Sequence, residues 1–209
     1  MYIYRTFTYG LYKYMNEKYT KKIFADTLKE LSKTKDLKRI KVSDIIKECS
    51  LNRGTFYYHF KDKDDLISWI FQTDIVEYFR EAKRKEWTHN TYHFLKVMQK
   101  DRAFYRQALE IDTYNNLKKL LYDMNLNAAL SIINNALNGR QLSEEGRNFL
   151  ADFYASAFTE TNIHFLKNDT IQTPEKLLQY YYDLSEPSLF LSLDRFIEHD
   201  QSKGMLPEQ

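Results

Sequence analysis

Glycine and proline are scarce in this chain, and this scarcity limits its possible folds more than any other feature of the sequence. Only 5 Gly and 3 Pro stand among 209 residues, against 17 Tyr and 14 Phe. Barrels of many strands and parallel sheets with Gly-rich phosphate loops need frequent turn residues. No strand-like alternation of apolar and polar residues persists along the chain. We therefore predict an all-α fold with long helices.

The remaining composition excludes several classes of protein. Hydrophobic residues make up 43% and charged residues 29% of the chain, which is typical of a globular protein. A single cysteine, Cys49, leaves no internal disulfide and no multi-cysteine metal site, and agrees with a reducing cytosol. The sequence has neither a membrane-spanning apolar stretch nor a signal-peptide core. We expect a cytoplasmic protein without a membrane segment.

The net charge of +2 conceals an asymmetry along the chain. Residues 1–66 contain 15 Lys and Arg against 9 Asp and Glu, a net charge of +6, whereas residues 67–209 contain 16 against 20, a net charge of −4. A basic segment joined to a mildly acidic one is typical of a nucleic-acid reader attached to a second module. An ordinary solvated surface explains the same charges equally well.

Helical periodicity marks four segments in the first part of the chain. Thr20, Asn52 and Asp62 are residue types that cap helices. Phe56 and Phe60 lie four residues apart, so they share one inward face of a short helix. The predicted helices cover residues 20–33, 42–49, 52–59 and 62–86.

The second and third predicted helices are short and joined by a tight turn, which is the arrangement of a helix-turn-helix. The N-terminal end of its second helix has to approach bases in a major groove about 12 Å wide. Gly54 removes a side chain at that end, and Arg53 beside it can reach a guanine edge or a phosphate. Thr55, Tyr57 and Lys63 can contact the DNA backbone. Alternatively, the aromatic residues of this segment only pack around the inward face.

The run from Ile40 to Leu66 resembles the DNA-binding signature of TetR-type transcriptional regulators, above all in Gly54-Thr-Phe-Tyr-Tyr-His-Phe60 with Lys63 and Leu66. The resemblance implies a three-helix DNA-binding domain, a helical C-terminal domain of six to seven helices for regulation and dimerisation, and a homodimer that reads a palindromic operator. The corresponding domain ranges are an N-terminal extension at 1–15, a DNA-binding domain at 16–62 and a C-terminal domain at 63–209.

Carried over residue by residue, the resemblance places one set of side chains at DNA. Arg53 and Gly54 face bases, and the others lie at or near phosphates. Two positions depart from the family's pattern. Lys41 stands in place of a threonine that caps the helix. Ser50 stands in place of the common turn glycine, and serine adopts a positive φ less readily than glycine does. The full DNA-binding set is Ser43, Asn52, Arg53, Gly54, Thr55, Tyr57, Tyr58, His59 and Lys63.

The second part of the chain also has helical periodicity. This part of the chain resembles the subgroup of dihydroxyacetone kinase operon regulators in three segments, Asp101–Arg106, Phe153–Lys167 and Thr173-Pro174-Glu175. The resemblance implies that some regulators of this subgroup respond to a partner protein. The helix predicted at 143–167 has two apolar rows, more than one core face needs. The predicted helices cover residues 90–99, 102–111, 114–138, 143–167, 174–184 and 187–200, and the predicted dimer contacts are Phe149, Phe153, Ala157 and Phe158.

Polar-tipped residues within these apolar helices suggest a pocket for a small-molecule effector. The candidates are Tyr105, Tyr122, Asn125, Tyr154 and His164, and ordinary core hydrogen bonding is the alternative. His89 and His93 lack a third metal ligand nearby, so we expect neither a metal nor a cofactor. No nucleophile, base and orienting group cluster in the sequence, which argues against an enzyme. We expect a regulator, most often a repressor in this family, under effector control, with control by a partner protein as the alternative.

The first fifteen residues contain six aromatic residues and no helix cap. They could form an arm that follows the DNA backbone. The interpretation that we favour is that translation begins at Met15.

Overall fold

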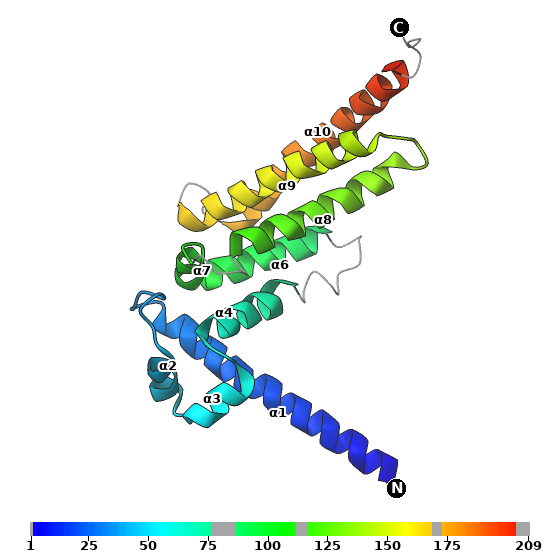
Figure 1. Cartoon of the computed structure of the whole chain (residues 1–209). Helices are drawn as coiled ribbons and strands as arrows, with labels where there is room; N and C mark the ends of the chain where they lie inside the picture. Colours follow the sequence, from blue (N-terminus) through cyan, green and yellow to red (C-terminus); the bar gives the residue numbers. More distant parts are fainter. Residues whose placement is uncertain (1, 77–86, 112–116, 169–172, 204–209) are drawn as a thin grey trace. The chain divides into compact units, whose positions relative to one another are not determined.

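The computed structural model of this chain describes residues 2–76, 87–111, 117–168 and 173–203 (Figure 1). The all-α prediction is confirmed, and these ranges contain no strand. The elements are α1 (Tyr2–Leu31), α2 (Val42–Cys49), α3 (Arg53–His59), α4 (Lys63–Phe71), the π-helix η1 (Gln72–Val76), α6 (Trp87–Lys100), α7 (Arg102–Ala108), α8 (Leu117–Leu137), α9 (Glu144–Lys167) and α10 (Pro174–Lys203). None of these helices has an apolar stretch long enough to cross a bilayer.

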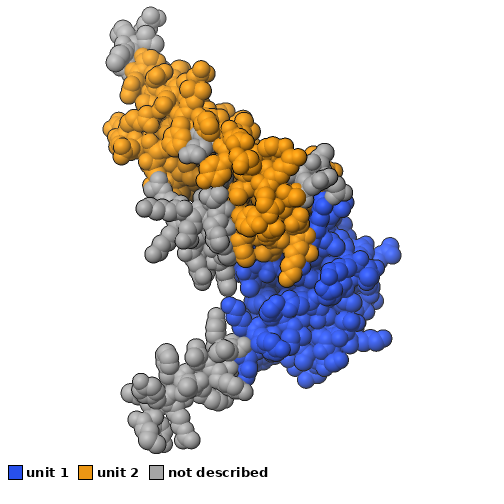
Figure 2. Space-filling model, turned by 180° about the vertical axis from the view of Figure 1, so that it is seen from behind, with its two compact units in different colours: residues 1–81, 101–114 blue, residues 82–100, 115–209 orange. Residues whose placement is uncertain are grey.

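Two compact units make up the molecule (Figure 2). The first comprises residues 1–81 and 101–114, and the second comprises residues 82–100 and 115–209. Helix α7 therefore belongs to the unit that contains α1 to η1, although it lies far from those helices in sequence. The functional boundary between residues 62 and 63 stays a prediction.

Aromatic side chains form the core of the helix-turn-helix. Phe56 is fully buried and Phe60 almost so, as their spacing predicts. The Phe24 ring of α1 meets the Phe56 ring edge-on, with centroids 5.2 Å apart. Such edge contacts add about 1 kcal/mol to the burial of each ring. This core fixes α3 across α1, with the opposite side of α3 in solvent.

Polar caps and one left-handed residue set the ends of these short helices. Asn52 accepts a hydrogen bond from the Thr55 N–H (2.7 Å), and Asp62 accepts one from the Asp65 N–H (2.8 Å), as predicted. Ser50 ends α2 with φ 57° and ψ 23°, the conformation that a turn glycine would adopt more easily. The turn therefore forms without glycine.

Two boundaries differ from the prediction. Helix α1 begins at Tyr2, so Thr20 lies inside it, and the Thr20 hydroxyl donates to the Asn16 carbonyl one turn back. Helix α4 ends at Phe71 and continues as the π-helix η1. Residues 77–86, which complete the predicted helix from 62 to 86, lie outside the described residues.

The second unit is built on the antiparallel pair of α8 and α9, against which α10 packs (Figure 1). Leu150 and Tyr154 of α9 enter a core with Leu189, Leu193 and Ile197 of α10. The prediction of two helices at 174–184 and 187–200 is wrong, because α10 runs through Pro187. Burial of its apolar face on both sides of Pro187 stabilises a helix that proline alone would interrupt.

Candidate DNA-binding surface

Helix α3 presents a polar and aromatic edge to solvent opposite its buried Phe56. Arg53 and Gly54 are exposed at its first turn, and Tyr57 is 47% exposed one turn later. The Arg53 guanidinium lies 5.5 Å from the centre of the Tyr57 ring. This cation–π contact holds the arginine over the helix in a geometry that leaves N–H donors for a base edge or a phosphate.

Gly54 lies in the first turn of α3, beside the cap. A Cβ atom built there would come 3.2 Å from the Asn52 side-chain oxygen and meet no other atom of the described structure within 4 Å. A larger residue at this position would therefore press against the Asn52 cap but against no other side chain of the described structure.

Tyr58 and His59 lie at the other end of α3, beside α1. The Tyr58 hydroxyl donates to the Glu17 carboxylate (3.2 Å), and the His59 ring packs edge-on against Tyr58. Burial, together with the positive charge of Lys21, lowers the pKa of His59 below its usual 6.5, although Glu17 opposes this change. At neutral pH the imidazole is therefore uncharged.

The N-terminus of α2 carries Ser43, which is exposed. As expected from its departure from threonine, the Lys41 side chain does not cap this helix. The Asp44 carboxylate instead accepts a hydrogen bond from the Lys41 backbone N–H (2.8 Å) and another from the Lys35 ammonium (2.5 Å). These hydrogen bonds lower the pKa of Asp44. The helix start is thus secured without the threonine.

Lys63, which the sequence predicts as a phosphate ligand, contacts the backbone of its own chain. Its ammonium donates to three backbone carbonyls of the loop between α1 and α2, those of Leu37 (2.7 Å), Lys38 (3.3 Å) and Ile40 (3.0 Å). An ammonium has three N–H donors, and these contacts use all of them. Burial lowers the pKa of Lys63. The structure makes Lys63 a support for this loop.

The predicted effector-pocket residues are divided between the two units. Tyr105 is buried in the first unit and donates to Asp74 (2.9 Å), whereas the other four belong to the second unit. There, Tyr122 donates to Asp152, and Asn125 donates to the Thr159 hydroxyl (3.0 Å). Tyr154 pairs with Ser188, and His164 is exposed. Four of the five residues therefore make hydrogen bonds within the protein, which is the alternative to a pocket: Tyr105, Tyr122, Asn125 and Tyr154.

The predicted dimer contacts divide into two groups. Phe149 and Phe153 are each 59% exposed, and Ala157 is exposed as well. Phe158 is half-buried within the subunit, and its ring meets the Tyr181 ring edge-on at 4.9 Å. Phe158 stays a predicted dimer contact, although part of its side chain packs against the intramolecular core.

Sequence reasoning missed a polar cluster that joins α7 to the helix-turn-helix. Lys29 of α1 is almost buried and bridges Asp74 of η1 (2.5 Å) and Asp101 before α7 (2.7 Å). Gln107 of α7 accepts a hydrogen bond from the Leu37 N–H (2.5 Å) and donates to the Ser32 carbonyl (2.6 Å). These partners are 45 to 75 residues apart in sequence, so local periodicity cannot indicate them.

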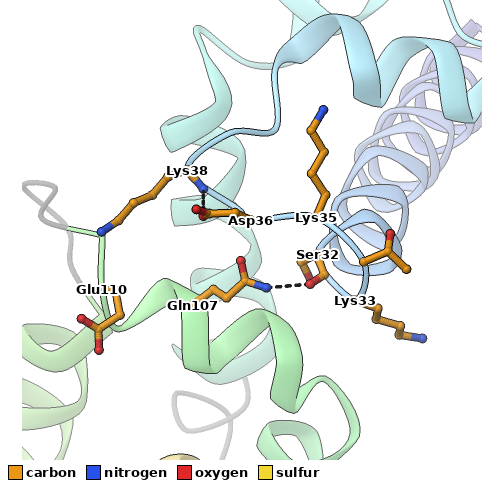
Figure 3. Close-up of a pocket in the computed structure, with 8 residues that line it drawn as sticks. Ser32, Lys33, Lys35, Asp36, Lys38, Gln107 and Glu110 are labelled. Carbon is orange, nitrogen blue, oxygen red and sulfur yellow. Dashed lines mark hydrogen bonds between the residues drawn. The ribbon is translucent and has the colours of Figure 1, made fainter.

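Gln107 also lines a concavity of about 490 Å³ beside the loop between α1 and α2 (Figure 3). Ser32, Asp36 and Lys38 contribute to it from the loop, and Glu110 from the segment after α7. Among the residues that the structure describes, no group of His, Cys, Asp or Glu is arranged to hold a metal ion. The side chain of His89 lies outside the described residues.

A helix-turn-helix with an exposed recognition edge, followed by a helical second unit, is the architecture of a DNA-binding regulator. Comparison with known proteins agrees with this class. Residues 26–68 match the family model "Bacterial regulatory proteins, tetR family", and residues 85–186 match the model "Transcriptional regulator C-terminal region". The chain belongs to the TetR family of transcriptional regulators, a family of regulators and not of enzymes.

Individual relatives match parts of the chain. The HTH-type dhaKLM operon transcriptional activator DhaS of Lactococcus lactis is 31% identical over 94 residues, 44% of this chain and half of the relative's length. An HTH-type transcriptional regulator of Staphylococcus aureus is 36% identical over 62 residues, 29% of this chain and 34% of that protein.

Two solved structures share the fold. The dihydroxyacetone kinase operon activator DhaS has a TM-score of 0.68 at 23% identity and covers 85% of this chain and 97% of its own. A TetR transcriptional regulator from Streptococcus agalactiae has a TM-score of 0.58 at 21% identity, with 84% and 98% covered.

Proposed function

We propose that this protein binds a palindromic DNA operator as a homodimer and regulates transcription from it. The observation that carries the proposal is the solvent edge of α3, where Arg53, Gly54 and Tyr57 lie on a helix held by a buried phenylalanine core. Arg53 is the proposed base-reading residue. Ser43, Thr55, Tyr57, Tyr58 and His59 are the proposed contacts to the DNA backbone, and Asn52 orders the first turn of α3.

The homodimer is supported by exposed apolar side chains on two helices of the second unit, and we propose that they form one surface, the α9–α10 face. It consists of Phe149 and Phe153 on α9 and Tyr180, Leu184 and Leu191 on α10, all at least 48% exposed. The three α10 residues share one side of the helix, because their spacing is four and seven residues. A two-fold axis lets the same face of a second copy cover it, and two α3 helices then read half-sites about 34 Å apart.

Regulation through the rest of the chain is supported by the cluster around Lys29. Because Lys29 and Gln107 tie α1 and its following loop to residues 101–107, a displacement of this segment would move the helix-turn-helix. We propose that a small-molecule effector displaces this segment. We also propose that the protein represses transcription. The Lactococcus relative is described as an activator, which favours activation as the alternative to repression. Control by a partner protein stays the alternative to a small-molecule effector.

Selection of bound fragments from a random duplex library, with the purified full-length chain, tests the proposed function. We expect enrichment of an inverted repeat. Arg53→Ala should lose about 1–3 kcal/mol on the enriched site and discriminate less among sequences, whereas Tyr57→Ala should weaken all duplexes alike. Failure to enrich any sequence, or to bind duplex DNA with salt dependence, contradicts the proposal.

A further inference from the structure

We propose that Arg39 and Lys41, in the loop between α1 and α2, bind DNA phosphates, and that Lys63 positions them without touching DNA. This inference rests on the proposed function. It adds Arg39 and Lys41 to the DNA contacts that the sequence indicates. It also removes Lys63 from the predicted phosphate ligands.

The loop is held in one conformation. Leu37 is fully buried and Ile40 is 2% exposed, so the loop is anchored at both positions. The Asp36 carboxylate accepts a hydrogen bond from the Lys38 N–H (2.9 Å), and the Asp36 carbonyl accepts from the Arg39 N–H (2.9 Å). The polar side chains between the anchors therefore have fixed starting points, which reduces the entropy lost when they bind a ligand.

Three of the five cations between residues 32 and 41 have other neighbours. Lys33 pairs with Glu30 (2.6 Å) and Lys35 with Asp44 (2.5 Å). Lys38 extends toward the segment that carries Glu110 (Figure 3).

Arg39 and Lys41 remain, on either side of buried Ile40. Arg39 is 84% exposed, and its contact with Asp36 is long at 3.9 Å. Lys41 is exposed, and no carboxylate within the described ranges pairs with its side chain. Both cations can reach an anion at little cost, because neither has to break a buried contact.

The position of these cations favours the DNA backbone as that anion. Lys41 directly precedes α2, whose first-turn N–H groups and exposed Ser43 are suited to a phosphate. Lys41 thus lies next to the start of α2, where Ser43 is already a proposed contact to the DNA backbone.

Lys63 acts through the loop. Its ammonium holds the carbonyls of residues 37, 38 and 40, which bracket Arg39 and directly precede Lys41. Bringing Lys63 to a phosphate would break these contacts, which costs more than an exposed arginine or lysine would lose. Lys63 is accordingly a positioning residue.

Salt-dependent binding of a mixed-sequence duplex tests this assignment without knowledge of the operator. With an ~30-base-pair labelled duplex and the full-length chain, Arg39→Gln with Lys41→Gln should lower the slope of log K against log salt by about 0.9 for each lost contact of each bound subunit. Lys38→Gln, the matched control in the same loop, should leave the slope unchanged.

Lys63→Met separates positioning from contact. It should speed hydrogen exchange of the amides at residues 37–41 and weaken binding, and in the Arg39→Gln, Lys41→Gln background it should lower the salt slope no further. A further loss of about 0.9 in that background shows that Lys63 is itself a phosphate ligand and overturns its role. An unchanged slope in Arg39→Gln with Lys41→Gln overturns the site. If the unmodified chain fails to bind the duplex, the proposed function itself fails.

Discussion

At the scale of single residues, Gly54 raises the question of whether the fold itself requires a glycine. Alanine there would gain up to about 1 kcal/mol of helix propensity, offset by the tight contact of its Cβ with the Asn52 cap at 3.2 Å. The fold does not need glycine at this position. We expect that a close approach of this surface to DNA does need it.

We therefore expect Gly54→Ala to change stability by less than about 1 kcal/mol and to weaken DNA binding at least about tenfold. Thermal unfolding and fluorescence anisotropy on the same preparation measure the two effects. Wild-type affinity in this variant would show that the first turn of α3 stays away from the DNA.

His59 should make DNA binding dependent on pH. Its lowered pKa leaves it neutral in the free protein at pH 7, while nearby phosphates favour the charged form. Binding then takes up a proton, so affinity should rise as the pH falls from 8 to 6, by up to about tenfold per pH unit for one proton. Lys21 and Glu17 are the charged groups that face this histidine from α1.

His59→Gln is the matched control variant, because glutamine is polar but does not take up a proton between pH 8 and 6. Its affinity should change less between pH 8 and 6 than that of the unmodified chain. Equal pH dependence in the two proteins would mean that His59 takes up no proton on binding.

At the scale of elements, Lys29 decides how α7 joins the helix-turn-helix. Burial alone would lower the pKa of Lys29, but Asp74 and Asp101 outweigh it and raise the pKa above 10.5. The stability from this cluster is therefore complete below pH 10.5 and is lost as the pH rises through the raised pKa.

Lys29→Met should destabilise the chain by about 3 kcal/mol, because two carboxylates then face each other without a cation. Adding Asp74→Asn and Asp101→Asn should recover part of that loss. Urea unfolding measures both. A cost below about 0.5 kcal/mol for Lys29→Met would show that the cluster does not hold α7.

At the scale of the whole molecule, the α9–α10 face predicts dimerisation. Phe149→Ser with Phe153→Ser should raise the dimer dissociation constant about 100-fold or more, because exposed aromatic anchors carry much of an interface's binding energy. Sedimentation equilibrium gives this constant. Tyr19→Ser, which removes a 67% exposed aromatic residue of α1, is the control and should leave it unchanged. An unaltered constant in the double variant would place the dimer contact elsewhere.

Local sequence patterns were sufficient for the fold class and for the short helices of the helix-turn-helix. The spacing of Phe56 and Phe60, the Asn52 and Asp62 caps and the scarcity of glycine and proline are read within one or two helical turns, so α2, α3 and the all-α class were predictable. Pro187 misled the prediction, since tertiary burial on both sides of it outweighs the local preference of proline.

Partnerships between distant residues were decided by the tertiary structure alone. A lysine near DNA-binding residues and a tyrosine among apolar residues have the same sequence signature whether they bind a ligand or a neighbouring helix. Packing determined that Lys63 holds the loop carbonyls, that Tyr105 and Lys29 join Asp74, and that part of the Phe158 side chain packs against the intramolecular core. The physical reason is that helix propensity and capping depend on near neighbours, whereas the partner of a polar side chain depends on which distant segments burial brings beside it.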